Sequence, residues 1–189
     1  MDDDDESVGR RITPKMLKQI VKEQNLYNSH QLNDKLYLHY RGIDRIENLE
    51  QWTGLRAIWL EGNGLAKIEN LLQQTELRCL YIHQNALSKI ENIDHCKHLA
   101  TVQLSNNQIA TIANLSALPK LSTLQMAHNL LEDAASVSHL LECPHISVLD
   151  LQNNRIDDPA VLDVFSAMPE LAVLQLQGNP FISKVPDYR

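Results

Sequence analysis

Residues 58–71 read IWLEGNGLAKIENL, and the same pattern returns in register as LYIHQNALSKIENI (80–93) and VQLSNNQIATIANL (102–115). Apolar residues and one asparagine keep their places, while the residues between them vary. A fixed period of this kind predicts a chain built from stacked copies of one structural unit.

One column of asparagines defines the unit. It comprises Asn63, Asn85, Asn107, Asn129, Asn154 and Asn179, with three spacings of 22 residues followed by two of 25. Each asparagine lies in the frame L-x-x-L-x-L-x-x-N-x-L, which is the leucine-rich repeat pattern. The L-x-L alternation predicts a short strand with one inward face. Parallel stacking of these strands buries that face in a core that no single repeat can form.

The predicted fold class is therefore α/β, a right-handed leucine-rich repeat solenoid. We expect a parallel sheet on the concave face, with short helical turns and then α-helices on the convex face, the change coming near residue 132. We name the column from Asn63 to Asn179 the asparagine ladder. Its side chains are expected to form hydrogen bonds with backbone groups that the bend after each strand leaves unpaired. A second column, Asn48, Asn70, Asn92 and Asn114, is expected to cap the convex helical turns by accepting a backbone N–H.

The chain divides into three predicted parts. Residues 1–11, with the aspartate run Asp2 to Asp5, form a disordered acidic tail. Residues 12–31 hold a capping helix, with Thr13 as N-cap and Pro14 in the first turn, and its connection. Residues 32–189 form the solenoid. The end at residue 189 has no comparable lid, so we expect a piece of a longer chain whose last coil is open to self-association.

Side chains between the strand leucines are expected on the concave face. One outward column begins with Tyr37, Trp59 and Tyr81, and its neighbour begins with His39, Glu61 and His83. The predicted partner-binding set is Tyr37, His39, Arg56, Trp59, Glu61, Arg78, Tyr81 and His83, with Lys35 at its border, because aromatic and arginine side chains dominate binding hot spots. The alternative is that the rings stack on one another and stiffen the sheet. A metal site at the two histidines and Glu61 is disfavoured, since His39 and His83 lie two rungs apart and a zinc site would also need a further ligand and supporting contacts.

Composition narrows the class of protein. The net charge is −7, which disfavours a nucleic-acid partner. No apolar run is long enough to span a membrane, and the three cysteines have no C-x-x-C spacing, so free thiols and cytoplasmic residence are expected. No nucleotide-binding, hydrolase or metalloprotease motif is present. We predict a non-enzymatic protein without cofactor or metal, with Trp52, Phe165 and Phe181 in the core.

The rows with IENL resemble the leucine-rich subclass typified by a regulatory subunit of protein phosphatase 1. More narrowly, NDKLYLHYRG (33–42), LQMAHN (124–129) and GNPFISKVPDYR (178–189) are similar to the leucine-rich repeat region of the axonemal dynein assembly factors, over a match from about Ile12 to the end. This resemblance implies a cytoplasmic scaffold for preassembling dynein arms of motile cilia or flagella, with axonemal dynein chains, chaperones and other assembly factors as partners. Arg41 stands where the first row would have its asparagine, a departure that we attribute to the edge position.

Two further functions stay open at this point. A regulatory subunit of protein phosphatase 1 would bind the phosphatase catalytic subunit on the same concave face. An RNA-associated scaffold would use the aromatic and basic rungs, because bases stack on such rings.

Overall fold

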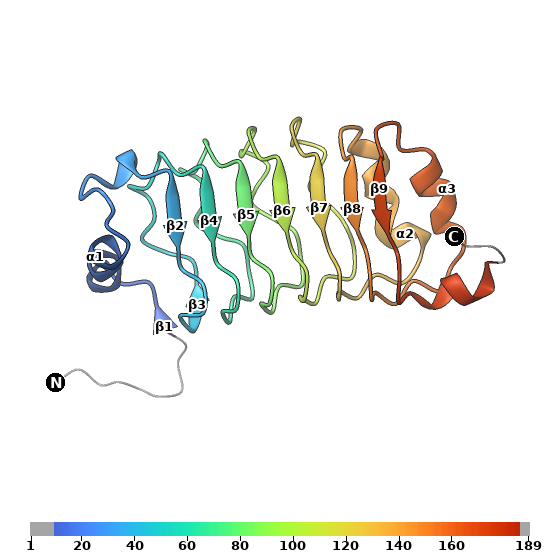
Figure 1. Cartoon of the computed structure of the whole chain (residues 1–189), viewed down its shortest axis with the longest axis horizontal. Coiled ribbons are helices and arrows are strands. Elements are labelled where there is room, and N and C mark those ends of the chain that lie inside the picture. The colour runs from blue at the N-terminus through green and yellow to red at the C-terminus, as the bar shows by residue number, and fades with distance from the viewer. Residues whose placement is uncertain (1–9, 186–189) are drawn as a thin grey trace.

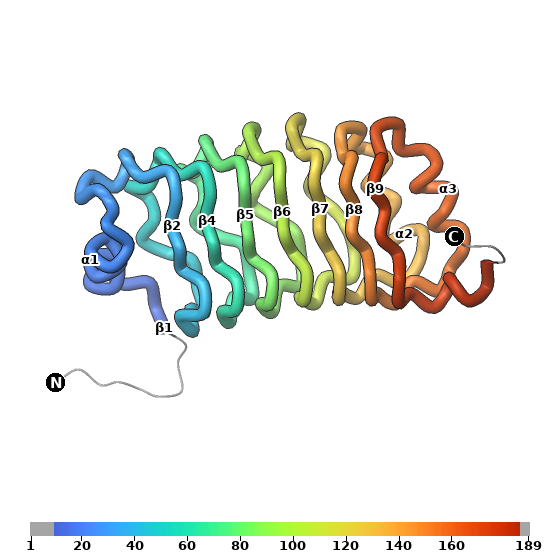
Figure 2. The backbone as a smooth tube through the Cα atoms, in the orientation of Figure 1, coloured from blue at the N-terminus to red at the C-terminus, as the bar shows by residue number. Residues whose placement is uncertain are grey.

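Seven short parallel strands, one from each repeat, form the main sheet, and β1 and β3 form a second sheet of two strands. The computed structural model describes residues 10–185. The strands follow chain order in the sheet, β2-β4-β5-β6-β7-β8-β9, and each coil stacks on the one before it (Figures 1 and 2). Leu36 lies opposite Ile58 and Ile58 opposite Leu80, so the pairing register equals the repeat period. The predicted leucine-rich repeat solenoid is confirmed.

The elements are short. The strands are β1 (Arg10–Arg11), β2 (Lys35–Tyr37), β3 (Ile43–Arg45), β4 (Ala57–Trp59), β5 (Cys79–Tyr81), β6 (Thr101–Gln103), β7 (Thr123–Gln125), β8 (Val148–Asp150) and β9 (Val173–Gln175). The helices are α1 (Pro14–Glu23), α2 (Ala134–Val137) and α3 (Val161–Ser166), with 3₁₀ turns η1 (His30–Leu32), η2 (Ser138–Glu142) and η3 (Pro180–Lys184). No helix within residues 10–185 has the length and apolar content to cross a bilayer.

The core runs the length of the solenoid. Its central column is fully buried from Leu36 to Leu149, while Leu174 of the last strand β9 is only partly buried. Burying one such leucine contributes about 1.5–3 kcal/mol, so the repeat supplies its stability rung by rung. The predicted core positions Trp52, Phe165 and Phe181 are buried.

The ladder asparagines hold the bend that follows each strand. The side-chain oxygen of Asn107 accepts the N–H of Leu87 at 3.0 Å, and its amide donates to the carbonyls of Leu104 at 2.9 Å and Ile82 at 3.2 Å. The same three kinds of bond recur at Asn63, Asn85, Asn129, Asn154 and Asn179. Each asparagine therefore joins its own coil to the preceding one through groups that would otherwise be buried without partners.

The residue before each ladder asparagine, and before Arg41 at the same position of the first row, adopts the left-handed backbone conformation. This column is Tyr40, Gly62, Gln84, Asn106, His128, Asn153 and Gly178, with φ between 50° and 79°. Glycine and asparagine tolerate this region, whereas other residues reach it at a cost of about 1–2 kcal/mol. The bend thus requires a left-handed position in every coil, and sequence reasoning missed it.

The second asparagine column does not cap helical turns as we expected. Asn48, Asn70, Asn92 and Asn114 also have positive φ, between 57° and 61°. Their side-chain amides donate to carbonyls of the preceding coil, those of Ile12, Ile46, Ile68 and Ile90, at 2.6–2.7 Å. The expected role as N–H acceptor is wrong, because asparagine is used here for its tolerance of the left-handed region and for its donor.

The N-terminal end of the sheet is covered by α1. Thr13 accepts the N–H of Met16 at 3.1 Å, and Leu17, Ile20 and Val21 are buried against the first coil. Arg41, at the position of the missing ladder asparagine, lies 2.9 Å from the Glu23 carboxylate.

The predicted tail boundary needs a correction. Arg10 and Arg11 form β1, which pairs with β3, so the ordered chain begins before residue 12. Paired backbone bonds hold this segment to the first coil, as in the bond from Arg10 N–H to the Gly42 carbonyl at 3.0 Å. The aspartate run lies outside the described residues.

The convex side becomes helical at Ala134. Asp133 caps α2 by accepting the N–H of Ser136 at 2.8 Å. The next convex helix, α3, begins at Val161, two residues after Pro159, because the Asp158 carboxylate accepts the N–H of Ala160 at 2.9 Å and holds a turn there.

Candidate functional site

Three aromatic rings stand in one column on the outward face of β2, β4 and β5. Tyr37 pairs with Trp59 and Trp59 with Tyr81 in the strand register. The ring centroids are 4.3 Å apart in the first pair and 5.0 Å in the second, with interplanar angles of 25° and 15°. All three are half-buried. Both expected features are present, the shared outward face and the stacking, and we name this set the aromatic ladder.

Stacking decides which part of each ring faces solvent. Trp59 has Tyr37 against one face and Tyr81 against the other. Trp59 therefore presents its edge and not a face to a partner, and Tyr37 and Tyr81 each have one face covered by Trp59. Aromatic edges carry the positive side of the ring quadrupole, so this strip is apolar and weakly electropositive.

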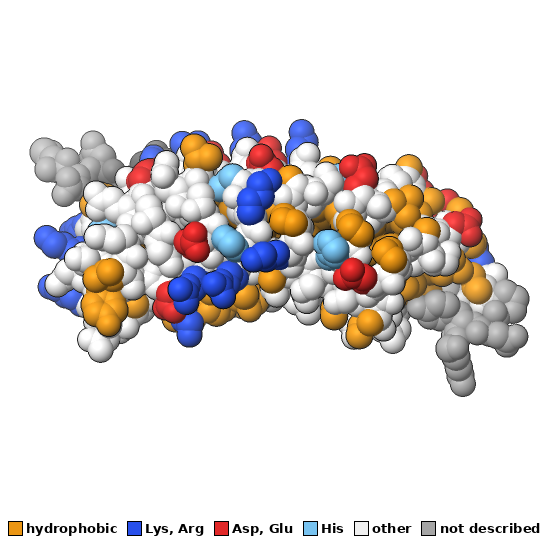
Figure 3. All heavy atoms as spheres, turned by 90° about the horizontal axis from the view of Figure 1, so that it is seen from above, with side chains coloured by type: hydrophobic (Ala, Val, Ile, Leu, Met, Phe, Trp, Pro, Cys, Tyr) orange, Lys and Arg blue, Asp and Glu red, His pale blue; other side chains and the backbone are white. Residues whose placement is uncertain are grey.

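The cationic rim borders the ladder on the side where the strands begin. We define it as Lys35, Arg56 and Arg78, all exposed and none within ion-pair distance of an acid among residues 10–185. Backbone bonds from Arg78 to Arg56 and from Arg56 to Asp34, both 2.8 Å, place the two arginines on adjacent rungs. Figure 3, the view from above, shows Lys and Arg side chains on this edge of the molecule, with acidic and histidine side chains among them.

A polar column borders the ladder on the other side. Nδ1 of His39 lies 3.9 Å from a carboxylate oxygen of Glu61, an ion pair only when His39 is protonated. Burial lowers the pKa of His83, an effect that the negative charge of Glu61 partly offsets. No group of three or more His, Cys, Asp or Glu within residues 10–185 is arranged to hold a metal ion.

The face changes character after β5. Gln103 donates to Gln125 at 2.6 Å, and Gln152 donates to Gln175 at 2.8 Å. Gln103, Gln125 and Gln175 lie in the column that holds rings in the earlier rungs, and Gln152 lies in the neighbouring column. The aromatic part of the concave surface is thus confined to the first three rungs, within the predicted partner-binding set.

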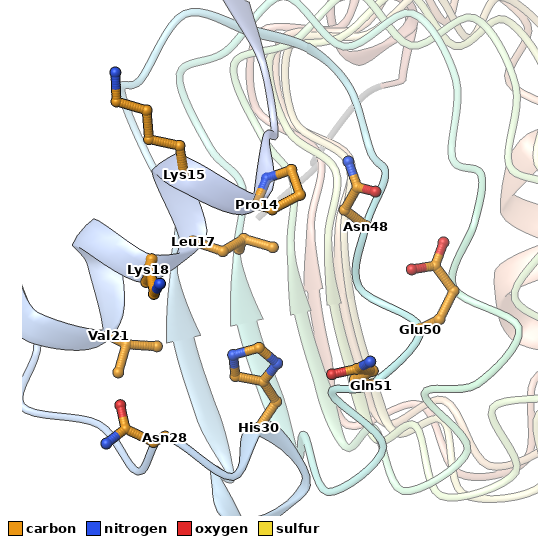
Figure 4. Close-up of a pocket in the computed structure, with 10 residues that line it drawn as sticks. All are labelled: Pro14, Lys15, Leu17, Lys18, Val21, Asn28, His30, Asn48, Glu50 and Gln51. Atoms are coloured by element: carbon orange, nitrogen blue, oxygen red, sulfur yellow. The ribbon is translucent and has the colours of Figure 1, made fainter.

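A hollow lies between α1 and the convex side of the first coil, outside the predicted partner-binding set. It has a volume of about 820 Å³ and is lined by residues that include Leu17, Val21, His30 and Gln51, with Lys15 and Lys18 on its helix side (Figure 4). His30 stacks on the buried Trp52 at 4.6 Å. Sequence reasoning did not find this hollow, because it depends on how α1 docks and not on the repeat.

Comparison with known proteins agrees with the fold. Family models described as leucine-rich repeats match residues 75–117 and 142–164. An internalin from Listeria monocytogenes is similar with a TM-score of 0.67 and 25% identity, over 77% of this chain and 42% of that one. Internalin C2 from the same organism has a TM-score of 0.62 and 18% identity, over 88% and 84% of the two chains, which is a likeness of fold alone.

Sequence similarity to curated proteins is higher but shorter. Mouse dynein axonemal assembly factor 1 is 53% identical over 58 residues, which is 31% of this chain and 9% of the mouse protein. The human protein of that name is 54% identical over 50 residues, 26% of this chain and 7% of that protein. A Drosophila erecta homolog is 55% identical over 53 residues, 28% of this chain and 4% of that protein.

Proposed function

We propose, from this similarity to dynein axonemal assembly factor 1, that the chain is a non-enzymatic scaffold whose concave face binds a protein during the cytoplasmic preassembly of axonemal dynein arms. The chain carries a leucine-rich repeat fold of the kind that presents a broad surface to other proteins. The dynein-related role rests on a match to less than a tenth of the mouse protein's length. Action in the cytoplasm, and a need for it in motile cilia or flagella, belong to the proposal.

The aromatic ladder carries the proposal. Three large rings at consecutive rungs of an outward column, bordered by Arg56 and Arg78, form a surface of the composition that dominates protein interfaces. The rings stack, but stacking leaves their edges outward. The same residues can therefore both stiffen the sheet and contact a partner.

A catalytic role has little support. The acid and histidine side chains nearest the ladder are His39, Glu61 and His83, and no serine, cysteine or lysine nucleophile is hydrogen-bonded to them among residues 10–185. Without a nucleophile and base in mutual contact, the arrangement lacks the geometry that acid–base or covalent catalysis needs. We infer a binding protein with no cofactor.

The RNA-associated alternative is weakened by the ring geometry. Bases stack on the faces of aromatic side chains, and both faces of Trp59 are covered by its neighbours. The phosphatase-regulator alternative would use the same concave face, so it is separated from the dynein role only by the identity of the partner.

Site-specific crosslinking in ciliated cells tests the proposal. A photoreactive phenylalanine in place of Tyr81 puts the probe on the ladder, and the same residue in place of Lys89 puts it on the exposed convex side of the same repeat. We expect dynein chains, chaperones or other assembly factors to crosslink from position 81 and not from position 89. Recovery of the phosphatase 1 catalytic subunit would favour the alternative, and equal crosslinking from both positions would overturn the concave-face model.

A further inference from the structure

We infer that the segment bound at the aromatic ladder is an extended acidic peptide, which crosses the rungs with its carboxylates toward Arg56 and Arg78. This inference rests on the proposed function, because it names the chemistry of the partner that the concave face takes. It draws on the charges around the ladder, on the ring geometry and on the small side chains beneath the rim.

The arginines of the rim form no ion pair with an acidic side chain among the described residues. Arg11, Arg41, Arg45 and Arg155 each lie within 4.0 Å of a glutamate. Arg56 and Arg78, by contrast, have no such partner within residues 10–185. In a chain of net charge −7, two adjacent unpaired arginines beside an apolar strip favour an anionic ligand, since Arg–carboxylate contacts are among the stronger hydrogen bonds.

The two acids on the same rim do not neutralise it. Asp34 precedes Lys35, and Glu76 lies two residues before Arg78. Both are exposed, and neither is paired with a rim cation among residues 10–185. Lys97 and Lys120 continue the basic character along the next rungs, where they contact the Ala117 carbonyl at 3.0 Å and the ring of His98 at 3.3 Å.

The floor beneath the rim is made of small side chains, of which Ala57 is buried and Cys79 half-buried. In the strand register Lys35 is followed by Ala57 and Cys79, which are small side chains flanked by Arg56 and Arg78. Successive rungs are about 4.8 Å apart, so the ladder spans about 10 Å and matches about three residues of extended peptide.

The two sides of the ladder differ in charge, which orients the segment. Cations lie on the strand-start side, and Glu61 lies on the other side between two histidines. Ring edges between them suit apolar or acceptor groups. A segment with acids along one side satisfies this arrangement, whereas a basic segment would be repelled by the rim. RNA is also anionic, but its bases would find both faces of Trp59 and one face of each tyrosine covered.

Fluorescence anisotropy with defined probes tests the inference. The acidic probe is a labelled peptide of about 12 residues, about 40 Å when extended, in which glutamate alternates with valine or tyrosine. The controls are the same peptide with lysine for each glutamate and a single-stranded RNA of similar length. We expect the acidic peptide to bind more tightly than both controls, and its affinity to fall as salt rises through about 0.1 M. Equal or tighter binding of the lysine peptide or of RNA would overturn the inference, as would no binding of the acidic peptide.

A charge swap supplies the matched control. Arg56→Glu with Arg78→Glu changes the net charge as much as Lys67→Glu with Lys89→Glu, which lie exposed on the convex side of the same repeats. The first pair should weaken the acidic peptide by about 10-fold or more, equivalent to one step of 1.4 kcal/mol, and should raise affinity for the lysine peptide. The second pair should do neither. Equal losses in both variants would mean a diffuse charge effect and would overturn the inference.

The two proposals fail separately. Arginine-dependent binding of the acidic peptide, with no assembly factor crosslinked from position 81, would keep the docking chemistry and remove the dynein role. Crosslinked assembly factors that still bind the Arg56→Glu, Arg78→Glu variant would keep the role and remove the acidic-peptide docking.

Discussion

The side-chain amide of Gln24 pairs with the backbone of Tyr37 as a neighbouring strand would. Its nitrogen donates to the Tyr37 carbonyl at 2.6 Å, and its oxygen accepts the Tyr37 N–H at 3.2 Å. Tyr37 is in β2, the edge strand of the sheet. Unpaired edge groups invite pairing with another chain, so one glutamine after α1 closes the edge beside the first ring of the aromatic ladder.

Replacing Gln24 with alanine should reopen this edge. We expect the free energy of unfolding to fall by about 1 kcal/mol, since two partly exposed hydrogen bonds are lost, and concentration-dependent association to appear. Urea unfolding and light scattering measure the two effects. Gln19→Ala is the control, because Gln19 bonds only to the exposed Glu23 among the described residues. If the two variants had the same free energy of unfolding and the same light scattering, water would satisfy the backbone groups of the edge strand as well as Gln24 does.

Asn107→Ala should destabilise the solenoid by about 1–3 kcal/mol, the usual cost of leaving buried polar groups unpaired. The substitution removes an acceptor for Leu87 and a donor for Leu104 and Ile82 at a buried position. Urea unfolding gives the value. Gln108→Ala, one residue away and exposed, should stay within about 0.5 kcal/mol of the parent. An unchanged midpoint of urea unfolding for Asn107→Ala would refute the structural role of the asparagine ladder.

Gly62 and Tyr40 should be energetically coupled. A Cβ at Gly62 would lie 2.1 Å from Cε1 of Tyr40, and Gly62 has φ +65°. Gly62→Ala therefore combines a steric clash with the cost of about 1–2 kcal/mol for a side chain in the left-handed region. In a Tyr40→Ala background only the second part should remain.

Four unfolding curves, for the parent, the two single variants and the double variant, give the coupling free energy of this pair. Tyr40 also donates a hydrogen bond to Gln84 at 2.6 Å, and that loss is present in both Tyr40→Ala proteins, so it cancels. A Gly62→Ala cost that is the same in both backgrounds would mean that the ring moves aside freely.

The repeat period predicts which residues face inward and which share a column. Spacing alone placed Leu36, Ile58 and Leu80 in register, and it put Tyr37, Trp59 and Tyr81 on one outward face. It did so because a strand alternates its side chains and parallel coils repeat the alternation. The composition of the candidate surface was therefore readable from the chain, while what the surface binds stays a prediction.

The repeat period did not predict which residues have positive φ, nor whether an asparagine side chain donates or accepts a hydrogen bond. The columns at Tyr40 and Asn48 share positive φ, but a period carries no information on the sign of a dihedral angle. An asparagine offers both a donor and an acceptor, so its letter does not say which one the fold uses. The Gln24 contact lies outside the repeat altogether, and only the docking of α1 creates it.

Stability should depend on pH through His83. Because burial lowers its folded-state pKa below the ordinary value of 6.5, the unfolded chain binds the proton more tightly. The contribution is fully present above the unfolded pKa and is lost as pH falls through the folded-state pKa. Urea unfolding at about pH 7.5 and pH 5.5, on either side of the ordinary value, should show a smaller loss for His83→Gln than for the parent. An equal loss in both proteins would assign the dependence to other groups.

Trp59→Ala should weaken the solenoid without unfolding it. The substitution removes two stacked contacts, each contributing about 0.5–1.5 kcal/mol beyond area burial, so we expect a loss of about 1–3 kcal/mol in urea unfolding. The buried Ile58 and Leu60 behind the ring stay in place. Trp59→Phe keeps a ring between Tyr37 and Tyr81 and should retain most of the stability.

The second tryptophan makes this experiment self-controlled. With Trp59 removed, Trp52 is the remaining one of the two tryptophans in the chain, and it is fully buried. Its emission should stay that of a buried indole in Trp59→Ala, so any loss of partner binding, expected at about 2 kcal/mol or more, can be assigned to the surface and not to the core. A red-shifted Trp52 emission in native buffer would instead mean that the ladder is needed for folding, and the stacking alternative would then explain the rings.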